Sequence, residues 1–569
     1  MDSITHQNRV AKTVAVLLFV VTAFTWKSGT DPVNIPKEFI LVIGVFYLFG
    51  LSFLQLKRVT FSETKPLLFC LVFFISALVL SVAFSEAPIT HQLFGVYGRA
   101  LGLLTYLSFA LLCYVIAINS STNLMKWVEV SLHMSFFYNS VICLFQISGV
   151  ELLGYNNIFK SVLGTFGNPN FVSAFLGIFV SWVMSHLISK KTSRLVKSLV
   201  LAEIILAIFL IIKSNSRQGL IIIGFSIILI IYFHIRSSQN LIRFVLPYRF
   251  LAGILSFLIG LGVFNIGPLA DLIYKVSISL RMQYWKAAIH MLEKNLLNGV
   301  GLNSYGDWYR EARDPSALVS PGIDIVTNSA HNIPLDFGAT GGLPLVVSYL
   351  AIQLVVLRAI FRLSRQSVVF NREHIALISS WVAFTLQSLI SIDQIGVSIW
   401  GWAISGLIIA ANRNLKHEES RVKKNERRVE ARKVLEKSTS LGPLVLAPIF
   451  AIVGLIIVLP AFRADLAWGK AITTGDINQI KSAADAWPQD EMRYGTATFI
   501  FGNNKIWDEA LVYARKTLEF NPRSYAVWRM ILNNPRADLE TRRIALGKMR
   551  TLDPNNKTLS DELLTNVGG

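Results

Sequence analysis

The sequence has few charged residues for its length. Only 16% of its 569 residues are Asp, Glu, Lys or Arg, whereas 53% are hydrophobic, and the mean hydropathy is +0.51. A soluble domain averages about 25% charged residues, so this composition excludes an ordinary soluble protein. We expect an all-α polytopic membrane protein, because lipid requires the backbone polar groups of each spanning segment to be paired within that segment.

Cysteine is scarce as well, and acidic residues are outnumbered by basic ones. The three cysteines, Cys70, Cys113 and Cys143, all lie inside apolar runs, so they indicate neither a disulfide framework nor a metal-ligand pattern. The formal net charge of +19 would suggest a nucleic-acid partner in a soluble protein. Here the basic residues lie in short segments between apolar runs, so we expect membrane topology, and not nucleic acid, to explain them.

Long apolar runs recur along the chain, and most are near the roughly 20 residues that cross a bilayer. We predict about thirteen transmembrane helices, at residues 12–26, 39–55, 66–84, 101–118, 127–149, 171–189, 195–212, 219–234, 248–267, 334–361, 375–391, 395–411 and 441–462. The predicted organisation is nine helices within 1–267, an outer loop at 268–333, four helices within 334–462 with a basic loop at 412–440, and a tail at 463–569.

Lys and Arg are concentrated in alternate loops. Counted from the N-terminus, the even-numbered loops are basic and end with the dense stretch Arg413–Lys437, which we expect to be helical, whereas the odd-numbered loops hold few basic residues. The positive-inside rule therefore predicts that the N-terminus and the even loops lie in the cytoplasm. With thirteen spans, the loop 268–333 and the C-terminal tail would then lie on the extracytoplasmic side of the membrane.

The tail repeats a short pattern with a regular period. Pro488, Pro522 and Pro554 each follow a segment rich in helix-forming residues. Their spacing is close to the 34-residue period of tetratricopeptide repeats, in which paired helices end at a proline. We predict a tetratricopeptide-like helical module on the extracytoplasmic side, which would bind or position a protein partner and perform no chemistry itself.

Several polar residues lie where membrane topology does not explain them. Arg is disfavoured in outer loops, yet Arg99, Arg217 and Arg281 fall in predicted outer loops, among Gly and Asn residues that permit tight turns. Guanidinium groups are planar, permanently charged forks that suit phosphate oxygens. We expect them to form an anion site, with His331 beside it, although an isolated Arg at a span end commonly snorkels to lipid headgroups.

In this order, these residues resemble the O-antigen ligase and polymerase superfamily of bacterial membrane glycosyltransferases. The matching pieces, spread over about residues 90–345, are Tyr97-Gly98-Arg99, Gly164–Asn170, Ser214–Gly219, Arg281-x-x-x-Trp285, Gly299-Val-Gly301 and the run from His331-Asn332 to Gly341-Gly342. The superfamily includes ligases, polymerases and protein oligosaccharyltransferases, and the resemblance does not distinguish them. The repeat-like tail is an addition to the family's minimal pattern.

The resemblance implies a multi-pass protein of the bacterial cytoplasmic membrane that uses a glycan donor linked to undecaprenyl pyrophosphate. The acceptor would be a lipid, a growing polysaccharide or a protein. By the same resemblance, Arg99, Arg217 and Arg281 would bind the pyrophosphate and His331 would be the base that activates the acceptor. Secondary candidates for substrate binding are Asn168, Asn170, Trp285, Asn332, Asp336 and Asp393.

The predicted outer loops hold no Asp-x-Asp pattern and no acidic cluster with the spacing of metal ligands. We therefore expect transfer without a metal and without any other cofactor. Guanidinium groups that are held in place can stabilise the charge of a leaving pyrophosphate by themselves.

Two other functions stay open. A transporter or flippase of lipid-linked glycans would favour charges near the bilayer midplane and duplicated halves with Gly- or Pro-broken spans, and the sequence shows little of either. Alternatively, the membrane part would only anchor the tail as a scaffold.

Overall fold

The computed structural model describes residues 3–56, 61–119, 121, 123–154, 157–237, 241–263, 266–273, 276–365, 371–425 and 442–561. The regular structure within these ranges is entirely helical, and this confirms the predicted fold class.

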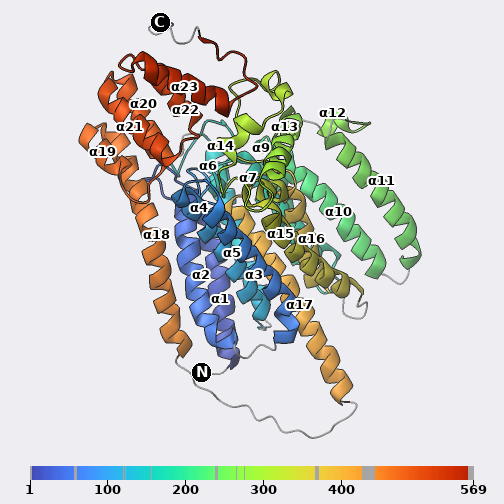
Figure 1. The fold of residues 1–569 in the computed structure, drawn as a ribbon. Coiled ribbons are helices and arrows are strands. Elements are labelled where there is room, and N and C mark those ends of the chain that lie inside the picture. Colours follow the sequence, from blue (N-terminus) through green and yellow to red (C-terminus); the bar gives the residue numbers. More distant parts are fainter. Residues whose placement is uncertain are drawn as a thin grey trace.

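Each of the predicted apolar runs falls on a helix of one large bundle (Figure 1). The helices are α1 (Ser3–Ala23), α2 (Asn34–Leu56), α3 (Phe61–Phe84), α5 (Leu103–Ile118), α6 (Leu124–Ile147), α7 (Pro169–Val183), α9 (Arg194–Lys213), α10 (Gln218–Ser237), α11 (Val245–Val263), α15 (Ile333–Arg365), α16 (Arg372–Ser388), α17 (Ile395–Asn425) and α18 (Gly442–Thr474).

Ten helices in the described ranges are long and apolar enough to cross a membrane, which is fewer than the thirteen predicted. The three others are α1, α5 and α16. Helices α5 and α16 have only 16 and 17 residues, and α1 has a polar first half. All three pack within the bundle: α1 lies against α2 and α6, α5 against α2 and α17, and α16 against α7 and α10.

The basic stretch Arg413–Lys437 begins as a helix, because α17 continues to Asn425. The rest of that stretch lies outside the described residues. Figure 1 places the N-terminus at one end of the bundle and the helices of the tail at the other. Which end faces the cytoplasm stays a prediction from the loop charges.

An aromatic cluster fills the bundle beneath the end that carries the tail. The ring of Phe74 on α3 lies 5.6 Å from that of Phe337 on α15 and 5.6 Å from that of Trp402 on α17. Tyr106 on α5 closes the cluster, with its ring 5.0 Å from Phe337. Because edge-to-face aromatic contacts constrain the orientation of each ring, four helices from distant parts of the chain are held in register here.

Helix α15 is broken near its start, although the sequence predicts one unbroken span at 334–361. Gly342 has φ 72° and ψ −173° and is followed closely by Pro344. The break leaves backbone groups without partners inside the helix, and the segment that follows α13 supplies partners for them. The amide of Val300 donates to the Ala339 carbonyl at 2.9 Å, and the amide of Leu343 donates to the Leu296 carbonyl at 2.7 Å. The first half of α15 is therefore a separate short helix braced by the outer loop.

The shorter loops, the outer loop and the tail contain helices too. The remaining helices are α4 (Ile89–Phe94), η1 (Gly164–Phe166), α8 (Ser185–Ile188), η2 (Ile242–Phe244), α12 (Ala270–Ile273), α13 (Val276–Lys294), α14 (Tyr305–Ala312), η3 (Pro315–Leu318), α19 (Ile477–Ala484), α20 (Glu491–Asn503), α21 (Trp507–Phe520), α22 (Tyr525–Leu532) and α23 (Leu539–Leu552).

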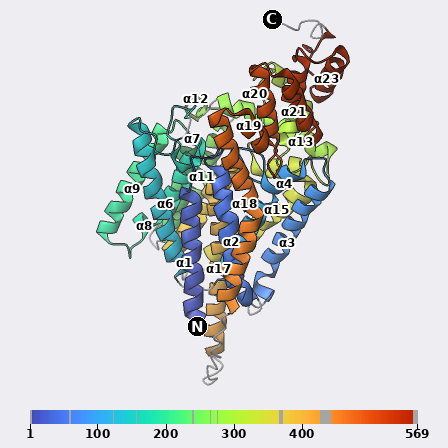
Figure 2. The ribbon, with the colours of Figure 1, turned by 90° about the vertical axis from the view of Figure 1, so that its left-hand side faces the viewer.

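The tail continues directly from the membrane bundle. Helix α18 packs along α2 and passes the predicted domain boundary at residue 463 without interruption. The tail therefore begins as a direct continuation of a membrane helix (Figure 2). In the tail, α20 pairs with α21 and α22 pairs with α23. Paired helices agree with the expected helical module, while its tetratricopeptide character stays a prediction.

Salt bridges join the tail to the outer loop. Asp553, which is completely buried, accepts from Arg313 at 2.6 Å and from Arg310 at 3.3 Å. Arg523 pairs with Glu311 on α14. The last helices of the chain are thereby held against α14, which lies directly before the segment that carries His331.

Candidate active site

His331 lies directly before the short first half of α15. Its backbone has φ 55°, and its amide donates to the Ser329 hydroxyl at 3.2 Å. The side-chain oxygen of Asn332 accepts from the Leu335 amide at 3.0 Å and so caps the helix. The imidazole rests beside the ring of Tyr284 on α13, with centroids 5.4 Å apart. The helix start thus holds the imidazole at a place where the macrodipole favours negative charge.

Arg99 reaches this region from the turn between α4 and α5. Gly98 and Ala100, on either side of it, both have positive φ, and this tight turn presents the guanidinium, which donates to the side-chain oxygen of Asn328. Burial lowers the pKa of Arg99, whereas the carboxyl groups of Asp336 and Asp393 raise it. Arg99 is therefore a half-buried cation that faces two acidic side chains.

Arg281 approaches His331 from α13. Burial lowers the pKa of Arg281 to about 10, so it stays charged at neutral pH. The pKa of His331 is lowered to about 3, first by burial and then by the positive charges of Arg281 and Arg99. The structure thus brings two guanidinium groups within electrostatic reach of one neutral imidazole, although the three residues are far apart in sequence.

Two acidic residues complete this cluster. Asp336, one turn into α15, accepts from the Ala330 amide at 2.9 Å, which closes the loop that carries His331. Asp393, in the turn between α16 and α17, accepts from the Tyr106 hydroxyl at 3.2 Å and from the Gln394 amide at 2.9 Å. Burial raises the pKa of Asp393 to about 7, so this carboxyl group titrates near neutral pH.

The third arginine of the predicted site is Arg217. It is an exposed residue in the turn between α9 and α10. The neighbouring Ser216 hydroxyl donates to Asn170 at 2.8 Å, and the side chain of Asn168 caps α7 by accepting from the Asn170 amide. The segment Gly164–Asn170 therefore forms a short 3-10 helix and a helix cap; Thr165 bonds to Asn139 on α6, and Asn170 bonds to the turn that carries Arg217.

Three aromatic residues, one of them the predicted candidate Trp285, lie on the elements around the cluster. Trp285 follows Tyr284 on α13 and is half-buried. The hydroxyl of Tyr305 donates to the Tyr284 carbonyl at 2.6 Å, and that of Tyr97 donates to the Thr30 carbonyl at 2.6 Å. These hydrogen bonds fix the positions of the backbone segments around the site. Asn332 adds a further brace, because its side-chain amide donates to the Leu389 carbonyl at 3.0 Å.

Sequence reasoning missed two polar residues that belong to the cluster. Tyr106 binds Asp393 but lies inside an apolar run, where a tyrosine resembles any other core aromatic. The side-chain amide of Asn303 donates to the Leu101 carbonyl at 2.5 Å. Asn303 has φ 60°, and its place directly after the Gly299-Val-Gly301 piece was the only signal in the sequence.

A small cavity joins these side chains. Its walls include Arg99, Asn303, Asn328, Asp336 and Asp393. Asn303 and Asn328 also line a larger neighbouring cavity whose far wall is formed by the tail. The small cavity therefore opens towards the space between the outer loop and the tail, and Arg99 lines its inner end together with the carboxyl groups of Asp336 and Asp393.

Comparison with known proteins agrees with the resemblance drawn from the sequence. No curated protein matches this chain. Residues 202–350 match the family model described as O-antigen ligase. This segment includes Arg217, Arg281, His331 and the broken start of α15. The protein is thus a multi-pass membrane protein that carries an O-antigen ligase family domain at residues 202–350.

Proposed function

We propose that the protein transfers a glycan from undecaprenyl pyrophosphate to an acceptor on the extracytoplasmic face of the membrane. The acceptor would be a lipid, a growing polysaccharide or a protein. The observation that carries the proposal is the grouping of Arg99 and Arg281 around the neutral imidazole of His331, at the start of a helix. This arrangement suits a dianionic leaving group beside a proton acceptor.

The pyrophosphate would lie between the two guanidinium groups. As the bond between the sugar C1 and the phosphate oxygen breaks, negative charge grows on that oxygen, and guanidinium groups that are already in place stabilise it without reorganisation. The charge of the arginines makes a metal unnecessary for this step. Arg217, in the turn between α9 and α10, would contact another part of the same donor.

His331 would take the proton of the acceptor. In the free protein its pKa of about 3 makes the imidazole a weak base. A bound pyrophosphate offsets the charges of Arg281 and Arg99, and this raises the pKa of His331 towards the operating pH. The acceptor oxygen or nitrogen then attacks C1 directly, its proton passes to the imidazole, and undecaprenyl pyrophosphate leaves. Base activation would thus depend on the presence of donor.

The test uses the purified full-length protein in detergent with a lipid-linked glycan and an acceptor. We expect His331→Ala to abolish transfer. We expect Arg217→Lys to do so as well, because a point charge cannot reproduce bidentate phosphate contacts. The matched controls are His234→Ala and Arg243→Lys, at exposed positions on α10 and η2, which should keep the parental rate. Parental rates in His331→Ala and Arg217→Lys would disprove the assignment.

The break in α15 favours one alternative. Discontinuous helices whose ends point at an anionic substrate are typical of transporters, and Gly342 creates such an end. A transporter or flippase of lipid-linked glycans would need a membrane with two sides. Formation of the glycosylated product in detergent, with no gradient, distinguishes transfer from transport.

A further inference from the structure

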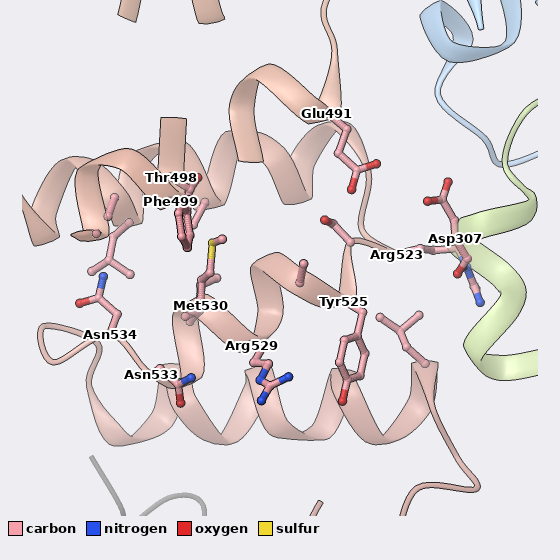
Figure 3. A pocket seen from close by; sticks show the side chains of 18 of the residues that line it. Asp307, Glu491, Thr498, Phe499, Arg523, Tyr525, Arg529, Met530, Asn533 and Asn534 are labelled. Carbon is pink, nitrogen blue, oxygen red and sulfur yellow. The ribbon is translucent and has the colours of Figure 1, made fainter. Parts of the chain in front are cut away.

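A second group of ligating side chains lies between the outer loop and the tail, apart from His331. It consists of His91 on α4, Asp307 on α14 and Glu491 on α20. A ring nitrogen of His91 and one carboxylate oxygen of each acid all lie within 4.8 Å of one another. In Figure 3, Glu491 and Asp307 extend from two different elements towards the same space. Three segments that are distant in sequence thus place one ligand atom each around a common point.

The imidazole of His91 is not satisfied by the protein around it. The residue is 3% exposed, and its Nδ1 atom has no hydrogen-bond partner in the part of the chain that the structure describes. Its Nε2 atom accepts from the Glu491 amide at a long 3.3 Å and lies 3.8 Å from the carboxylate of Asp490. Burying a polar nitrogen without a partner is unfavourable, and the long contact at Nε2 leaves the electron pair of that ring nitrogen available to a cation.

The two carboxylates of this group lie close together. One oxygen of Asp307 and one of Glu491 are among the three ligand atoms that lie within 4.8 Å of one another. Asn521 donates to Glu491 at 2.5 Å but carries no charge. The nearby cation, Arg523, pairs with Glu311 and lies over the ring of Trp308 at 3.4 Å. Two carboxylates this close repel each other, and a cation between them would remove the repulsion.

We propose that His91, Asp307 and Glu491 bind a divalent transition metal such as Zn²⁺ or Mn²⁺. One imidazole with two carboxylates suits such ions, whereas Ca²⁺ and Mg²⁺ prefer oxygen ligands alone. The metal would join the membrane bundle, the outer loop and the tail at one point and hold the tail over the cavity. This inference goes beyond glycan transfer, because none of the ligands belongs to the cluster around His331.

The experiment uses the full-length protein without an affinity tag, purified in detergent and stripped with a chelator. Zn²⁺, Mn²⁺ and Ca²⁺ are added separately, and bound metal after desalting and the midpoint of thermal unfolding are measured. We expect Zn²⁺ or Mn²⁺ to bind stoichiometrically and to raise the midpoint, and Ca²⁺ to have a much smaller effect. Binding of no metal, or of Ca²⁺ in preference, would overturn the proposal.

Variants then test the ligands. We expect His91→Gln and Asp307→Asn to lose the bound metal, and Asp508→Asn, at an exposed position on α21, to retain it. Asp307→Asn also controls for folding, because removing one of two repelling carboxylates should leave the metal-free midpoint equal to or above that of the parent. If Zn²⁺ raises the midpoint of Asp307→Asn as much as that of the parent, these residues are not the ligands.

Discussion

At the scale of single residues, the proton affinity of His331 depends on its charged neighbours. Burial lowers its pKa first, and Arg281 and Arg99 lower it further, to about 3. The imidazole is therefore neutral throughout the physiological range in the free protein. The pH dependence of kcat/KM reports the pKa values of the free enzyme. The fall in kcat/KM that results from protonation of His331 should therefore occur well below pH 6.

Replacing Arg281 tests this dependence. We expect Arg281→Gln to raise the pKa of His331, because the substitution removes a positive charge that opposes protonation. The pH below which kcat/KM falls should move upward, and the rate at the optimum should fall as well, since an anion contact is lost. The pH profile of glycan transfer measures both effects. An acid limb that stays in place, as we expect for the exposed control Arg243→Gln, would contradict the role of Arg281.

At the scale of elements, the break in α15 decides where the site residues lie. Gly342 has φ 72°, and a Cβ atom at this position would lie 2.7 Å from the backbone carbonyl oxygen of Leu296. The short helix before the break carries Asp336 and follows His331, whereas the longer helix after it belongs to the bundle. A continuous helix would move the His331 loop away from Arg99.

Gly342→Ala should therefore destabilise the protein. Left-handed or related strained backbone costs about 1–3 kcal/mol for a residue with a Cβ atom, and the clash with the Leu296 backbone adds to this. The matched control is Gly260→Ala in α11, where a Cβ atom would meet nothing within 4 Å and helix propensity favours alanine. Thermal unfolding in detergent compares the two, and equal midpoints would show that the break is not required.

At the scale of the whole molecule, the tail is held against the outer loop by buried charge. Arg313 and Asp553 are both 0% exposed in their side chains and are 2.6 Å apart. Asp553 belongs to the third proline-containing segment of the tail, so the repeat pattern itself supplies the residue that contacts α14. The position of the tail over the cavity therefore depends on a few specific pairs.

Asp553→Asn should loosen the tail. Removing one partner of a buried ion pair typically costs about 3–5 kcal/mol, because the other charge stays buried without compensation. The control Asp561→Asn removes the partner of Arg550 in a pair whose side chains are 79% and 45% exposed, and exposed pairs contribute roughly 0–1 kcal/mol. Limited proteolysis of the tail should be faster in Asp553→Asn than in the parent protein and should be unchanged in Asp561→Asn. Equal rates in the two variants would contradict this prediction.

The sequence by itself determined the helical membrane fold and most of the residues of the candidate site. Apolar runs locate helices because lipid leaves the backbone no other partner. Arginine is disfavoured in outer loops, so its presence there singles out Arg99, Arg217 and Arg281. Only the tertiary structure broke α15 at Gly342, brought Tyr106 to Asp393 and brought His91 to Asp307 and Glu491. These features depend on packing between segments that are distant in sequence, and no local pattern of hydrophobicity or charge records such contacts.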